Sequence, residues 1–185
     1  VEILTQDVLL DVYKDHEFAP YWTNQDRIKE LLELITDSAD HGLVPADYNI
    51  DQLHQVLQRR QSNPSAEIEA EAEILLMESL LRYGYHRRYG KIKASTLDQD
   101  INFKREKFHH QGIPVSIEQM LSSESLSDFI EMVAPTGPVY QHLQTSLRVY
   151  RGLQKNGGWP VVPEGSTLRL GASDPRVAII SNGLA

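Results

Sequence analysis

The run EIEAEAE, from Glu67 to Glu73, is a dense group of side chains that could do chemistry. Glu67 and Glu71 would share one face of a helix, and so would Glu69 and Glu73, because residues four apart are neighbours on a helix. Two carboxylates on facing elements could serve as the catalytic pair of a glycoside hydrolase. However, the run lies where a helix is expected to begin, and the helix dipole stabilises acidic side chains there. It therefore predicts a solvated helix start, and a carboxylate-dependent glycan hydrolase is the third-ranked hypothesis.

Other catalytic and metal-binding patterns are missing from the sequence. The chain has seven histidines and no cysteine, which excludes a thiol nucleophile, a thiolate metal ligand and a disulfide. The close pair His109 and His110 is adjacent in sequence, and adjacent side chains point in different directions on a helix or a strand. No His-Glu-x-x-His spacing, nucleophile elbow or glycine-rich phosphate loop occurs. We therefore expect no catalytic residue, no metal site and no cofactor in this chain.

A segment rich in tyrosine and arginine, LLRYGYHRRYGKIKASTL, runs from Leu80 to Leu97. Interleaved Arg and Tyr side chains can hold an anionic or carbohydrate ligand, or a partner domain, through charge and stacking. The alternative is structural: Tyr83 and Tyr85 would belong partly to the core, and the arginines would complement the negative end of a long helix. The residues that we predict to bind are Tyr85, Arg87, Arg88, Tyr89 and, further along the chain, Trp159.

Helical periodicity extends over most of the chain. The first clear stripe is Ile28, Leu31, Leu32, Ile35 and Ala39, with Asn24 or Thr23 as the N-cap and Gly42 beyond its end. Further helices are expected with Asn49 or Asp51 as the cap, from after Pro64 to near Gly90, over 117–121 and 126–133, and along a last stripe. That last stripe consists of Tyr140, Leu143, Leu147 and Tyr150. No useful alternating pattern of a strand appears, so we predict an all-α fold whose core includes Leu75, Leu76, Leu80 and Leu147.

The end of the chain has a different character. Residues 156–172 are rich in glycine and proline and predict an extended strap, in which Trp159 would be anchored on the helical body. Asp174 then caps a new helix, Pro175 takes its first position, and Val177 and Ile180 recur at helical spacing. We therefore expect three parts: a helical domain over 1–155, an extended linker over 156–172, and the start of a further module over 173–185.

Charge and hydropathy limit the range of partners. The net charge of the chain is −8, which argues against a nucleic-acid-binding surface because Lys and Arg supply most of that affinity. No stretch approaches the roughly 18 apolar residues of a membrane span. The first residue is Val1, from which we expect a processed or excised piece of a longer protein.

Four segments in order resemble the N-terminal scaffold domain of the large multidomain L,D-transpeptidases of Gram-negative bacteria, which cross-link murein. The first two are VYKDHEFAPYWTN and ADHGLVPADYNIDQL, the second similar to the family's His-Gly-Leu-x-Pro-x-Asp-Tyr turn. The third is LRYGYHRRYGKIKASTL, and the fourth runs from Tyr140 to Ala185, similar to the join between the scaffold and the peptidoglycan-binding domain. The resemblance covers nearly the whole chain.

This resemblance implies a periplasmic scaffold domain without catalytic activity of its own. In the family a cysteine nucleophile and a histidine lie in a later domain, and since this chain has no cysteine, no catalytic residue can be assigned to it. The expected partners are the C-terminal catalytic and peptidoglycan-binding domains, and peptidoglycan itself. Residues 173–185 would begin a truncated or degenerate peptidoglycan-binding module. The alternative that the residues leave open is a free-standing helical module that binds a protein or a glycan.

Overall fold

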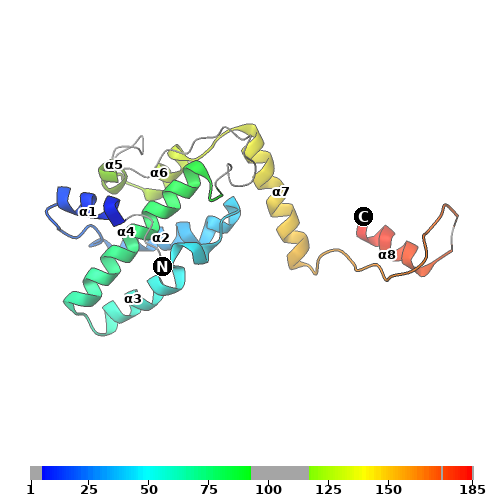
Figure 1. Ribbon diagram of the computed structural model, residues 1–185, viewed down its shortest axis with the longest axis horizontal. Helices are drawn as coiled ribbons and strands as arrows, with labels where there is room; N and C mark the ends of the chain where they lie inside the picture. The colour runs from blue at the N-terminus through cyan, green and yellow to red at the C-terminus, as the bar shows by residue number, and fades with distance from the viewer. Residues whose placement is uncertain (1–5, 93–116, 172, 185) are drawn as a thin grey trace. The chain divides into compact units, whose positions relative to one another are not determined.

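A computed structural model describes residues 6–92, 117–171 and 173–184 of the chain. The described helices before the first gap are α1 (Gln6–Asp15), α2 (Gln25–Asp37), the 3₁₀ helices η1 (Ser38–His41) and η2 (Pro45–Tyr48), α3 (Ile50–Ser62) and α4 (Ala66–Tyr89). After it come α5 (Ile117–Ser122), α6 (Leu126–Val133), α7 (Pro138–Lys155) and α8 (Pro175–Leu184). The described residues contain helices and no strand, which confirms the all-α fold (Figure 1).

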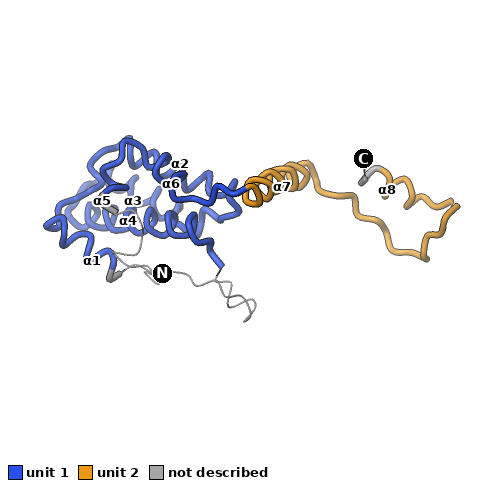
Figure 2. Tube along the Cα trace, turned by 90° about the horizontal axis from the view of Figure 1, so that it is seen from above, with its two compact units in different colours: residues 1–137 blue, residues 138–185 orange. Residues whose placement is uncertain are grey.

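The chain divides into two compact units, residues 1–137 and residues 138–185 (Figure 2). The first unit holds α1 to α6 and the main hydrophobic core. The second holds α7, the strap and α8. Each unit is therefore described separately below.

The central helix of the first unit is α4, which contacts α1, α2, α3 and α6. Its consecutive residues from Leu76 to Leu81 are all buried, so this part of the helix is covered on every side rather than along one stripe. Buried partners come from the neighbouring helices, namely Leu31 and Ile35 of α2, Leu53 of α3 and Ile130 of α6. Leu76 and Leu80 are fully buried as predicted, whereas Leu75 is only partly buried.

Local signals in the sequence explain where several helices begin and end. The Asn24 side chain accepts hydrogen bonds from the backbone N–H groups of Asp26 and Arg27 and so caps α2. Ser65 caps α4 in the same way, and Gly90 follows that helix with a φ of 77°. Gly42 has a φ of 75° after η1, a left-handed conformation that glycine adopts without strain.

Asn49 has a different role from the cap that we expected. It precedes α3, but its side chain makes no capping hydrogen bond. The amide instead donates to Glu78 Oε2 at 2.6 Å and to the Ser79 hydroxyl at 3.3 Å. Because Asn49, Glu78 and Ser79 are all buried, this bond satisfies polar groups inside the core and ties the start of α3 to α4.

In the second unit the predicted core position Leu147 proved wrong. No residue of α7 is buried, and Leu143, Val149 and Tyr150 are exposed. A helical stripe shows that one face of a helix is apolar, but it does not identify what covers that face. The apolar face of α7 is therefore a surface of this unit and not part of a core.

Candidate functional site

The Tyr/Arg segment forms the C-terminal turns of α4. Tyr85 and Tyr89 lie four residues apart on one face of the helix, and their ring centroids are 5.0 Å apart. The guanidinium of Arg88 lies 5.9 Å from the centroid of the Tyr89 ring, within the range of a cation–π contact. We call Tyr85, Arg88 and Tyr89 the aromatic–arginine surface.

Arg87 faces inward and stands apart from this surface. Only 3% of the residue is exposed, and its Nη2 donates to Oε1 of Glu131 in α6 at 2.5 Å. A buried guanidinium needs a partner of this kind because the charge is costly to remove from water. Arg87 therefore has a structural role in the last turn of α4, where it joins α4 to α6.

Arg88 is exposed and also contributes to the same junction. Its Nη1 donates to the carbonyl oxygen of Val133 at the end of α6, at 3.2 Å. Last-turn carbonyls have no partner within their own helix, so this contact satisfies one of them. The cavity beside this helix pair has a volume of about 30 Å³, close to the space of one water molecule. A ligand of this region would therefore bind on the aromatic–arginine surface and not within it.

Trp159 belongs to the second unit. Its ring lies 5.7 Å from the ring of Tyr150 in α7, and the residue remains 55% exposed. The expected contact with a helix is thus present, but it leaves more than half of the tryptophan exposed instead of burying it. As a half-exposed tryptophan, it remains a predicted contact residue.

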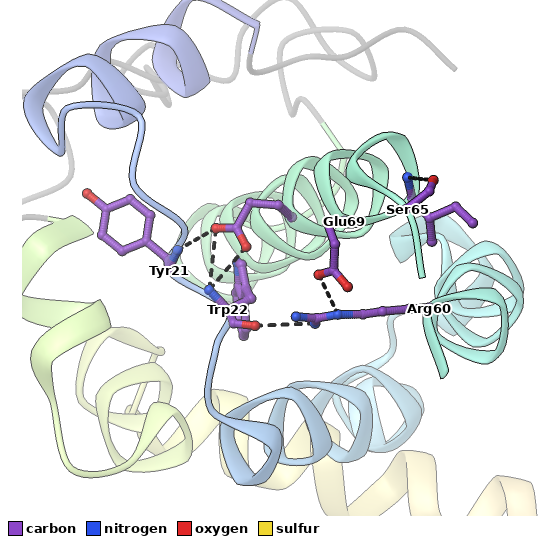
Figure 3. A network of polar contacts seen from close by, with 7 residues as sticks. Tyr21, Trp22, Arg60, Ser65 and Glu69 are labelled. Carbon is purple, nitrogen blue, oxygen red and sulfur yellow. Dashed lines mark hydrogen bonds and ion pairs between the residues drawn. The ribbon is translucent and has the colours of Figure 1, made fainter. Parts of the chain in front are cut away.

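The acidic run begins α4 as predicted, and Glu67 and Glu71 are exposed, but two of its carboxylates also pair with arginines of α3. Glu69 pairs with Arg60 of α3 at 2.7 Å, and Glu71 accepts two hydrogen bonds from Arg59 at 2.9 and 3.1 Å (Figure 3 shows the Glu69–Arg60 pair). These pairs join α3 to α4 across the turn between them. Hydrogen bonds at the helix start, with its own backbone and with Ser65, lower the pKa of the exposed carboxyl group of Glu67.

Glu73 has the most contacts of this run. It accepts hydrogen bonds from the backbone N–H of Tyr21 at 2.5 Å, from that of Trp22 at 3.2 Å and from the Tyr13 hydroxyl at 3.0 Å. Burial, reinforced by the charge of Glu73, raises the pKa of Tyr13. Because Tyr13 stays neutral, it remains a donor, and Glu73 fastens the segment between α1 and α2 to α4.

A groove between α1 and α4 was not predicted from the sequence. It has a volume of about 690 Å³, which falls in the range of ligand-binding clefts. Its apolar lining includes Leu9, Leu10, Phe18, Pro20, Ala70 and Ile74. Its polar lining consists of Tyr13, Thr23, Arg60, Glu69 and Glu73. We call this cavity the α1–α4 groove.

The sequence contained one weak signal for this groove. Phe18 and Ile74 are apolar but fall outside the stripes of the neighbouring helices, and the structure leaves them 66% and 47% exposed. Glu73 contacts residues that lie 52 or more positions away along the chain. The spacing of residues along one helix cannot reveal such a contact.

Metal and membrane features were also sought in the described part of the chain. Over residues 6–92, 117–171 and 173–184, no group of three or more His, Cys, Asp or Glu side chains is arranged to hold a metal ion. No helix among these residues has the length and apolar character needed to cross a membrane. His109 and His110 lie outside the described residues.

The fold and the contacts define an all-α domain built around one buried central helix, with polar ties between helices that are distant in sequence. Residues 7–147 match the family model described as Scaffold domain. The match covers most of the chain, and the protein therefore belongs to the Scaffold domain family. No curated protein and no solved structure matches the chain.

Proposed function

We propose that this chain is the scaffold domain of a peptidoglycan L,D-transpeptidase of the periplasm. It would hold the catalytic and wall-binding domains of that enzyme at a fixed mutual geometry while the wall is cross-linked. The parent protein would be a cysteine acyltransferase, with its nucleophile outside these 185 residues. The observation that carries the proposal is the Scaffold domain match over residues 7–147, together with the four sequence segments that resemble these enzymes in the same order.

The packing of the first unit supports a positioning role. A body that presents other domains must be stiffer than a flexible linker. In this unit α4 is covered on all sides over Leu76–Leu81, and Glu73 and Arg87 tie it to segments on either side. Two or more such ties restrict sliding of the neighbouring helices along α4.

Cell-wall analysis tests this proposal. The gene that encodes the chain is deleted in its own organism, and the muropeptides are analysed for cross-links that an L,D-transpeptidase makes. We expect these cross-links to decrease, and to return when the whole protein is restored but not when its scaffold carries Leu80→Ala. An unchanged cross-link content, or L,D-transpeptidase activity of the pure 185-residue chain, would overturn the proposal, because a thioacyl intermediate needs a thiol.

A free-standing binding module is the second candidate, favoured by the aromatic–arginine surface. Replacing Tyr85, Arg88 and Tyr89 by Ala should abolish co-sedimentation of the chain with purified peptidoglycan if this surface binds glycan. Replacing Met132, an exposed residue of α6, provides the matched control. Equal sedimentation of all the proteins would exclude this second function.

A further inference from the structure

The exposed face of α7 has the pattern of a helix that packs against other helices. Val139, Leu143, Ser146, Tyr150 and Leu153 recur at alternating spacings of four and three residues, which is the repeat of a helix–helix seam. We call these five residues the α7 seam. Its apolar members are between 39% and 71% exposed, and one flank of the seam carries Tyr140 and Leu147. The apolar face is therefore wider than a two-helix contact needs and suits a groove between two helices.

The α1–α4 groove is a second exposed apolar surface. Leu10, Phe18 and Ile74 line it and are 46%, 66% and 47% exposed. Glu17 and Phe18 both have left-handed backbone conformations, with φ of 52° and 57°. Bulky residues seldom adopt such angles, and strained conformations of this kind occur often at binding sites. Here the strain presents Phe18 at the edge of the groove.

The two units carry opposite net charges. The α7 helix contains Arg148, Arg151 and Lys155, which lie outside the seam, and no acidic residue. Residues 138–185 contain five basic and two acidic residues, a net charge of +3. Because the whole chain carries −8, residues 1–137 carry −11, and the groove itself is lined by Glu69, Glu73 and Arg60, of which Arg60 pairs with Glu69. Opposite charges of this size accelerate association and favour this pairing over contacts between like surfaces.

We propose that the α7 seam of one copy docks in the α1–α4 groove of a second copy. The described part of each chain offers one groove and one seam, so two copies can satisfy both surfaces in a closed two-fold pair. The link between α6 and α7, Ala134–Gly137, has only four residues, and short hinges favour exchange of an element between copies. The groove runs beside α1, which with ten residues is about 15 Å long. That length accommodates about three helical turns of α7.

The proposal goes beyond the scaffold function and is tested on the full chain by sedimentation equilibrium over a range of concentrations. We expect a monomer–dimer equilibrium that weakens when salt is raised from about 0.05 M to about 0.5 M, because screening reduces the attraction between the two surfaces. Ile74→Glu in the groove and Leu143→Glu in the seam should each raise the dimer dissociation constant about tenfold or more, because each places a charge in an apolar contact. Circular dichroism verifies that each variant remains helical.

Matched variants and a mixing experiment make the test specific. Met132→Glu is equally exposed but lies on α6, and Thr145→Glu lies on the opposite face of α7; both should dimerise like the parent chain. Mixing Ile74→Glu with Leu143→Glu should restore association, since one copy retains the seam and the other retains the groove. A chain that is monomeric at every concentration would overturn the proposal. A dimer that survives Ile74→Glu would overturn it as well. So would the finding that both variants only lower the stability of a monomer, because α7 would then dock in the groove of its own copy.

Discussion

At the scale of single residues, Glu73 shows how one carboxylate can organise a segment of chain. Its two oxygens accept from the backbone of Tyr21 and Trp22 and from the Tyr13 hydroxyl. Backbone N–H groups of a loop have no partner in a regular ladder, so a side-chain acceptor has to supply one. Glu73 supplies it for the segment that leads into α2.

Replacing Glu73 by Ala should therefore destabilise the first unit. We expect a loss of about 2–3 kcal/mol in the free energy of unfolding, because partly buried donors lose their acceptor. Urea unfolding followed by circular dichroism measures the change. The matched control is Glu33→Ala on α2, whose side chain is 64% exposed beside Lys29, with an expected change below about 0.5 kcal/mol. Equal changes at the two positions would show that Glu73 is not a structural acceptor.

The buried face of α4 gives the second prediction. Leu80 is fully buried, so Leu80→Ala should cost about 2–5 kcal/mol through lost burial and the cavity that remains. Met132→Ala, at a residue 64% exposed, should cost less than about 0.5 kcal/mol. Thermal unfolding of both variants tests this prediction. Equal shifts of their unfolding midpoints would contradict the burial pattern.

At the scale of helices, α2 is joined to the start of α6 by side chains on two successive turns. Arg27 donates to the carbonyl oxygens of Ser123 and Met120, at 2.6 and 3.1 Å. Glu30 accepts from the Ser125 hydroxyl at 2.8 Å and from the backbone N–H of Ser127 at 2.9 Å. The carbonyls before α6 and the N–H groups at its start thus both find partners on α2.

The pH dependence of this junction gives the third prediction. Partial burial acts to raise the pKa of Glu30, but the hydrogen bonds from Ser127 and Ser125 outweigh it and lower that pKa below its ordinary value. A carboxylate with a lowered pKa in the folded state stabilises the fold above its unfolded pKa of about 4.3, and this stabilisation is lost as pH falls through the folded pKa. Glu30→Gln should therefore cost about 1 kcal/mol at pH 7 and progressively less below pH 4. Denaturant unfolding at several pH values, with Glu33→Gln as the control, tests this; a cost of Glu30→Gln that stays constant with pH would contradict it.

Much of the helical structure could be predicted from the sequence, because capping residues and apolar stripes are local features of the sequence. Asn24, Ser65 and Gly90 end or begin helices through contacts within a few residues. The same reasoning failed for Glu73, whose partners lie more than 50 residues away, and for Leu147, whose apolar neighbours on α7 did not identify what covers them. For Trp159, the extended backbone indicated a need for anchoring but not the extent of burial. The binding role of the aromatic–arginine surface stays a prediction.

At the scale of the whole chain, the two units differ in how they are stabilised. The first has the main core, with Trp22, Tyr48 and Tyr83 among its fully buried side chains. The second has a long helix without a buried residue and depends on local polar ties. In that unit Arg176 donates to both carboxylate oxygens of Asp174 and to the carbonyl oxygen of Ser166. The segment after Gly171 is therefore tied to the strap through Ser166.

Limited proteolysis with trypsin distinguishes the parts of the second unit. Arg169 is exposed and lies outside any helix, so a protease can bind its backbone in an extended form. Arg176 lies in the first turn of α8 with its guanidinium engaged, and the hydrogen bonds from Arg176 lower the pKa of Asp174 to about 2, so this pair stays charged at neutral pH. We expect cleavage after Arg169 to precede cleavage after Arg176, because the second site requires local unfolding of α8. Mass spectrometry of the released C-terminal peptides measures the order.

Asp174→Ala removes both the helix cap and the ion pair, and should bring the two rates closer together without changing cleavage after Arg169. Equal rates at the two arginines in the parent chain would show that the ties of Arg176 do not hold α8 in place.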